Sequence, residues 1–197
     1  PEQIGELTNL ETLKVREAKV LSLPQSIGNL TKLTALEFES NGLGFLPDEI
    51  GKLTKLESLR ISHSEIRFLP CSMTNLVNLR RLDVHYHAIS NPLFSIPHFP
   101  NLQELTIRGV EKLKYLPSSI CNLGMLKILT LRNTKKNVWH STGEVCLQDE
   151  IENMQSLEVL DILDVLPHPG VLWDLPIAAL KKLKNLRIFN LSSRDAE

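Results

Sequence analysis

Apolar and polar positions between residues 33 and 79 follow one pattern that occurs twice. In the first copy Leu36 and Phe38 alternate with polar residues, and a Leu-Pro pair follows at 46–47. In the second copy Leu59 and Ile61 alternate in the same way, and a Leu-Pro pair follows at 69–70. Each apolar position thus recurs 23 residues later. Short alternation predicts a β-strand, and repetition at a fixed period predicts stacked units.

The repeat extends over nearly the whole chain. Its strand centres are expected at Leu13, Leu36, Leu59, Leu82, Leu105, Leu129, Leu160 and Phe189. The first four intervals are 23 residues, and the next are 24, 31 and 29. The spacing at 33–41, Leu-x-x-Leu-x-Leu-x-x-Asn, is that of a leucine-rich repeat. We therefore predict an α/β leucine-rich-repeat solenoid of horseshoe type. It has a parallel concave sheet of about eight short strands and a convex side of short helical or 3-10 turns and loops.

The segment that returns from one strand to the next reads Leu-Pro-x-x-Ile. Pro24, Pro47 and Pro117 suit the start of a helical turn, where the missing N–H costs little. The position held by Asn41 could bind turn backbone of neighbouring units through its amide. The other units offer no Asn there, so we expect this polar ladder to be weak.

Two stretches depart from the period, near 135–150 and 163–176, and we expect insertions there. Insertions in repeat proteins map to loops, often on a functional face. We treat 1–197 as a single domain. Because Pro1 and Ile4 match Pro24 and Ile27, the first residues correspond to the middle of a repeat, and we expect the chain to be a fragment of a larger protein.

Composition and net charge limit the classes of partner that the sequence leads us to expect. The net charge is −1, which gives no general reason to expect nucleic acid or an anionic membrane. No apolar run approaches 18 residues, so no membrane-spanning helix is expected. The three cysteines, Cys71, Cys121 and Cys146, are odd in number, and the first two occupy ordinary repeat positions. They do not form a disulfide framework, and we expect a reduced, cytoplasmic compartment.

No catalytic constellation is present in the sequence. Gly44 and Gly51-Lys52 only faintly resemble a phosphate loop, since six residues separate the glycines and Leu53 follows the lysine. The repeat register turns His85 outward and places His87 in the Asn41 position, which does not suit a metal pair. His140, Glu144 and Cys146 lack an obvious fourth ligand. We expect no enzyme activity, no metal, no cofactor and no small-molecule ligand.

The outward positions of the strands form three columns on the concave face. In the middle column Lys14, Glu37, Arg60 and Asp83 alternate in sign. Parallel neighbours lie about 4.8 Å apart, so these side chains should neutralise one another as an ion-pair ladder. Beyond this ladder, positive or aromatic residues have no matched acid in the third column: Arg81, His85, Tyr86, Arg108 and Arg132.

The C-terminal half of the same face is apolar. The first column changes there to Ile128, Val159 and Ile188, and Leu163 joins it from the third column. A contiguous apolar patch with polar borders marks an interface. The alternative is that one of the two insertions folds over the patch. The predicted protein-binding face therefore comprises Arg60, Arg81, Asp83, His85, Tyr86, Arg108, Ile128, Arg132, Val159, Leu163 and Ile188.

Residues 23–33 (LPQSIGNLTKL) and 113–123 (LKYLPSSICNL) resemble the leucine-rich-repeat domain of plant intracellular nucleotide-binding immune receptors. The uneven repeat lengths and poor Asn ladder are similar to that family too. The resemblance implies a cytosolic domain that recognises pathogen effectors and holds an adjacent nucleotide-binding domain inactive. Two other hypotheses stay open: a scaffold with Ras-associated-type repeats, and the substrate-binding repeats of a bacterial effector ubiquitin ligase.

Overall fold

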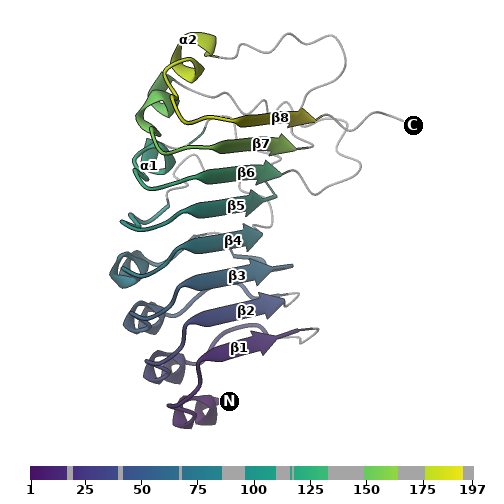
Figure 1. Ribbon diagram of the computed structural model, residues 1–197. Coiled ribbons are helices and arrows are strands. Elements are labelled where there is room, and N and C mark those ends of the chain that lie inside the picture. Colours follow the sequence, from purple (N-terminus) through teal and green to yellow (C-terminus); the bar gives the residue numbers. More distant parts are fainter. Residues whose placement is uncertain are drawn as a thin grey trace, which may run out of the picture.

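The computed structural model describes residues 1–16, 20–39, 42–66, 68–85, 96–109, 116, 118–132, 149–163 and 176–192. Within them, eight strands form one parallel sheet in sequence order (Figure 1). The strands are β1 (Thr12–Val15), β2 (Ala35–Glu39), β3 (Ser58–Ser62), β4 (Arg81–His85), β5 (Glu104–Arg108), β6 (Ile128–Arg132), β7 (Val159–Leu163) and β8 (Ile188–Ser192). Each expected strand centre pairs with the next, so the predicted solenoid is confirmed.

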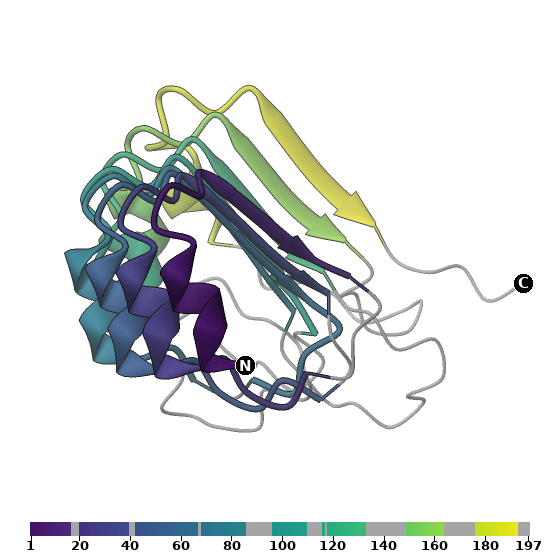
Figure 2. The ribbon, with the colours of Figure 1, turned by 90° about the horizontal axis from the view of Figure 1, so that it is seen from below.

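The return arms form short helices on the side away from the sheet (Figure 2). The 3-10 helices are Glu2–Glu6, Gln25–Asn29, Asp48–Lys52, Cys71–Asn75 and Asp149–Asn153, and the single α-helical turns are α1 (Ser118–Cys121) and α2 (Ile177–Leu180). Pro24, Pro47 and Pro70 stand one position before their helices, as extended N-cap residues. Their fixed φ directs the chain into the turn, and each carbonyl accepts the first helical N–H.

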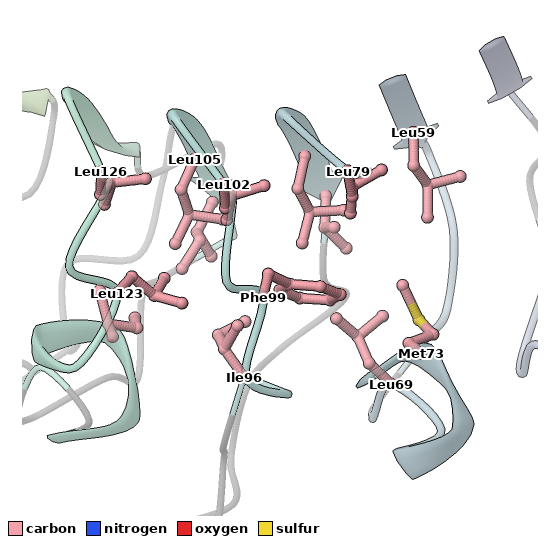
Figure 3. Close-up of a cluster of buried hydrophobic side chains, with 14 of the residues drawn as sticks. Leu59, Leu69, Met73, Leu79, Ile96, Phe99, Leu102, Leu105, Leu123 and Leu126 are labelled. Carbon is pink, nitrogen blue, oxygen red and sulfur yellow. The ribbon is translucent and has the colours of Figure 1, made fainter. Parts of the chain in front are cut away.

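Leucines of successive units fill the space between sheet and helices (Figure 3). The inward strand residues that the repeat predicts are at most 2% exposed: Leu36, Phe38, Leu59, Ile61, Leu82, Val84, Leu105 and Ile107. The unit after β4 is rich in proline, and its described part, 96–100, has no helix. Ile96 and Phe99 nevertheless occupy the core positions that Met73 and Leu76 hold one unit earlier. The core therefore continues through an irregular unit.

Asparagines on the flank that leads into each strand tie neighbouring units together. Asn78, Asn101 and Asn185 each donate from Nδ2 to a backbone carbonyl of the preceding unit, at 2.8 Å in all three cases. Asn41 itself lies outside the described residues, but Ser64 holds the equivalent position one unit later. Its buried hydroxyl donates to the carbonyl of His85 at 2.8 Å. Within the described residues, side-chain amides thus bridge neighbouring units on the flank that leads into the strands.

Leu59→Ala should lower the free energy of unfolding by about 2–5 kcal/mol, because the buried side chain leaves a cavity between two units. Urea denaturation measures the change. The matched control is Phe68→Ala, since Phe68 is 63% exposed and its loss should change stability by less than about 0.5 kcal/mol. Equal losses for the two variants would contradict the buried position of Leu59.

Gly51→Ala should cost about 1–3 kcal/mol, because a Cβ there would overlap the backbone carbonyl of Ser72 in the next helix. Gly44→Ala is the control, since a Cβ at that glycine meets nothing within 4 Å. The difference between their thermal unfolding midpoints tests how closely the short helices stack. Similar midpoints would mean that neighbouring helices separate freely.

Candidate protein-binding face

The outward-facing side of the sheet, which we call the open face, carries the three predicted columns in register. Ser58, Arg81, Glu104, Ile128, Val159 and Ile188 follow one another directly across six strands. The backbone ladder also includes the residue before each strand, since the Arg187 N–H donates to Glu158 and the Glu158 N–H to Lys127. The columns are therefore continuous rows at the spacing of the strands.

In the N-terminal half of the open face, the predicted ion-pair ladder is present. Lys14, Arg16 and Arg60 surround the Glu37 carboxylate at N···O distances of 3.8, 3.1 and 3.9 Å. Arg60 also reaches Asp83 at 3.5 Å. The Glu37 and Asp83 side chains are only 15% and 22% exposed, so these carboxylates are partly shielded from water.

Arg108 belongs to this network, contrary to the expectation that it would lack a matched acid. Its Nε and Nη2 donate to the two carboxylate oxygens of Asp83 at 3.1 and 3.0 Å. Asp83 lies in the middle column of β4 and Arg108 in the third column of β5, so the pair is diagonal. The long arginine side chain reaches from its own column to the neighbouring one. A search for acids within the third column alone therefore does not find Asp83. Such a bidentate pair fixes both groups.

The edge of the open face at β3 and β4 carries two histidines. The backbone N–H of His63 donates to Nδ1 of His85 at 3.3 Å, which makes that nitrogen an unprotonated acceptor. The two rings meet edge to face at 5.8 Å, and Nδ1 of His63 lies 3.5 Å from Glu39. His63 has a φ of 54°, in the left-handed region. Tyr86, predicted to belong to the binding face, and the neighbouring His87 lie outside the described residues.

In the C-terminal half, the apolar patch reaches the surface. Ile128, Val159 and Leu163 are half-buried, and Ile188 is 46% exposed. Arg132 is exposed and pairs in register with Leu163, and exposed Arg81 lies two strands from Ile128. Asn190 donates to Asp161 at 2.7 Å in the adjacent middle column. Most of the two predicted insertions lies outside the described residues, yet none of the four apolar side chains is buried.

A second set of apolar side chains lies on the flank that leads away from the strands. Leu21, Phe45 and Phe68 are 70%, 49% and 63% exposed on successive units. These three residues are not predicted to belong to a binding face, because they lie outside the strands and therefore outside the outward columns. Phe45 and Phe68 do occupy the same repeat position, directly before Leu-Pro. That recurrence is the signal that could have found them.

Other candidate chemistry does not come together within the described residues, and His87, His140, Glu144 and Cys146 lie outside them. The described residues contain no group of three or more His, Cys, Asp or Glu side chains that could hold a metal ion. Gly51 and Lys52 lie in a 3-10 helix of a return arm. Cys121 is buried, and its burial together with the charge of Glu150 raises the pKa of its thiol to about 11. Among the described helices, none has the length and apolar character needed to cross a bilayer.

Two family models match the chain. A leucine-rich repeat region matches residues 1–94, and a model of Zer-1-like leucine-rich repeats matches residues 70–165. The chain is a leucine-rich-repeat domain. A search of curated protein sequences found no match.

Solved structures of leucine-rich-repeat proteins resemble this domain. A Leptospira interrogans leucine-rich-repeat protein is 26% identical with a TM-score of 0.65, over 95% of this chain and 50% of that one. The leucine-rich-repeat domain of the type III effector XopL is 18% identical (TM-score 0.53, 95% and 78% covered). The ectodomain of the Arabidopsis thaliana receptor kinase GASSHO1/SCHENGEN3, in complex with CASPARIAN STRIP INTEGRITY FACTOR 2, is 21% identical (TM-score 0.52, 98% and 25% covered).

The domain thus spans about half the length of the Leptospira protein and a quarter of the receptor ectodomain. The two likenesses below 25% identity show the fold alone.

Asp83→Asn should destabilise the domain by about 1 kcal/mol at low salt, because it removes the carboxylate that Arg60 and Arg108 share. The loss should shrink in about 1 M NaCl, where the Debye length is about 3 Å. Denaturant titrations at both salt concentrations measure it. Glu104→Gln, on the neighbouring strand, is the control and should be neutral. A loss that is independent of salt would argue for packing rather than charge.

Proposed function

We propose that this leucine-rich-repeat domain is a non-catalytic protein-recognition module that binds its partner through the C-terminal half of the open face. The observation that carries the proposal is the column Ile128, Val159 and Ile188, which lies in register on adjacent strands and stays accessible. A contiguous apolar patch with polar borders is typical of an interface. The N-terminal half offers less, because Glu37, Arg60, Asp83 and Arg108 already neutralise one another.

We further propose that the parent protein is a plant intracellular immune receptor of the nucleotide-binding, leucine-rich-repeat class, acting in the cytoplasm. The support is the resemblance of residues 23–33 and 113–123 to the repeats of those receptors. In such a receptor the partner of the open face is a pathogen effector or the receptor's own nucleotide-binding domain. Both are folded proteins, which agrees with an apolar patch rather than a strongly charged one.

A bacterial effector that captures substrates through its repeats is the second candidate, and the likeness to XopL favours it on fold. At 18% identity that likeness does not extend to the partner. A Ras-associated-type scaffold has less support, because its regular repeats would keep Asn in the Asn41 position of most units. Flanking sequence separates the three: a nucleotide-binding domain before residue 1 selects the first, and a ligase domain after residue 197 selects the second.

Ile128→Glu combined with Val159→Glu should leave the thermal midpoint of the domain within a few degrees of wild type, because neither side chain is buried. In the full-length protein the double variant should abolish partner binding or release the resting state. The measurements are the melt of the domain and, in plant tissue, effector-independent cell death and effector co-precipitation.

The control for this experiment is Phe45→Glu with Phe68→Glu. It places the same two charges on apolar residues outside the open face, which are more exposed than Ile128 and Val159. It should leave both partner binding and the resting state unchanged. Normal partner binding together with a normal resting state in the Ile128 and Val159 variant would remove the patch from consideration.

A further inference from the structure

Three cations on β1 and β3, Lys14, Arg16 and Arg60, surround the carboxylate of Glu37 on β2, and we call them the cation cluster. Nη2 of Arg16 donates to both carboxylate oxygens, at 3.1 and 3.2 Å. Nζ of Lys14 lies 3.8 Å from Oε2, and Nη1 of Arg60 lies 3.9 Å from Oε1. Lys14 and Arg60 flank Glu37 in register on the two neighbouring strands. Three positive charges therefore converge on one negative charge.

The charges around the cation cluster do not cancel. Arg60 also lies 3.5 Å from Asp83, but Arg108 already binds both oxygens of that carboxylate. Glu39, the other outward acid of β2, lies 3.5 Å from Nδ1 of His63 and forms no ion pair with the cluster. Even if the whole charge of Glu39 is set against the cluster, one positive charge remains among the described residues.

The cations of the cluster are far more accessible than the carboxylate that they surround. The side chains of Lys14, Arg16 and Arg60 are 57%, 58% and 48% exposed, whereas that of Glu37 is 15% exposed. The adjacent first column has short side chains on the same three strands: Thr12, Ala35 and Ser58. A partner that approaches this part of the open face therefore meets positive groups first.

Most N–H donors of the cluster have no acceptor within the described part of the chain. The ion-pair contacts of Lys14 and Arg60 are 3.5 Å or longer, beyond ordinary hydrogen-bond distance. Arg16 donates through Nη2 alone. An ammonium has three donors and a guanidinium has five. The cluster can therefore donate to a further anion without giving up its contacts with Glu37.

We propose that the cation cluster binds a carboxylate from an acidic segment of the protein partner, as a second contact on the open face. Charge-assisted hydrogen bonds from arginine and lysine to a carboxylate are among the stronger polar contacts. A nucleic acid fits less well, because exposed Glu39 and Glu104 on the same face would repel a chain of phosphates. The inference adds a subsite to the proposed recognition role and does not depend on the apolar patch of β6 to β8.

Fluorescent peptides test this subsite with the whole domain. The acidic peptide carries glutamates spaced by Gly and Ser, and the control peptide has Gln in their place. Fluorescence anisotropy in about 10 mM NaCl should show binding of the acidic peptide and none of the control. The affinity should fall in about 100 mM NaCl, because the Debye length shortens from about 30 Å to about 10 Å.

A pair of double variants locates the binding. Lys14→Gln with Arg16→Gln should weaken binding of the acidic peptide about tenfold, because two charge-assisted contacts are lost. Both side chains are more than half exposed, so the melt of the domain should change little. The matched control is Lys52→Gln with Lys55→Gln. It removes the same net charge from exposed lysines outside the strands and should leave the affinity nearly unchanged.

Three results would overturn the proposal: equal binding of the acidic and Gln peptides, an equal loss in the two double variants, or an affinity for the acidic peptide weaker than about 1 mM at the lower salt. Single-stranded DNA of matched charge is the third probe. If it binds more tightly than the acidic peptide and loses affinity in the Lys14 and Arg16 variant, the site serves a phosphate backbone and the proposal is wrong. Because the peptides contain no apolar side chain, these results leave Ile128 and Val159 to their own test.

Discussion

Burial of leucines between successive units is the interaction on which the whole structure depends. A single unit of 23 residues has a short strand, a turn and a few apolar side chains, and it cannot enclose them alone. Leu59 is buried because Leu36 and Leu82 flank it in the same register. Stability is then close to a sum of terms between neighbours. For this reason the core passes through the irregular unit around Ile96 and Phe99 without a helix there.

Close stacking also has to be kept on the side away from the sheet. Strands repeat at a fixed spacing, and the return arms must approach equally closely or the units would separate at one side. Gly28 and Gly51 make this possible, because a Cβ at either position would overlap backbone of the next helix. Cys121 occupies the same repeat position and is buried there, with a thiol pKa raised to about 11. Its burial in a glycine position accounts for a structural rather than a reactive cysteine.

The strands, their order and their inward residues follow from the sequence because a period of 23 residues fixes the register of the whole sheet. The side-chain contacts follow less well. Arg108 has no acidic neighbour in its own column, but its long side chain reaches Asp83 in the adjacent column of the neighbouring strand. The sequence keeps a single Asn in the Asn41 position, so only a weak ladder is expected there. The repeat pattern does not predict the bonds of Asn78, Asn101 and Asn185, each of which reaches a turn carbonyl of the preceding unit. The left-handed backbone of His63 has no sequence signal at all.

In the proposed function, the open face serves recognition while the buried face of the same sheet provides stability. Outward positions do not determine the register, so they are free to vary, and the two halves of the face differ for that reason. Across β1 to β5, carboxylates are held between cations that reach them from both sides, and an apolar partner would have to displace those cations. Across β6 to β8, covering Ile128, Val159 and Ile188 removes apolar area from water, and none of these three side chains carries a charge. Desolvating paired charges costs free energy, whereas covering aliphatic side chains lowers it, and this difference supports the proposal that a protein partner binds at the C-terminal half of the face.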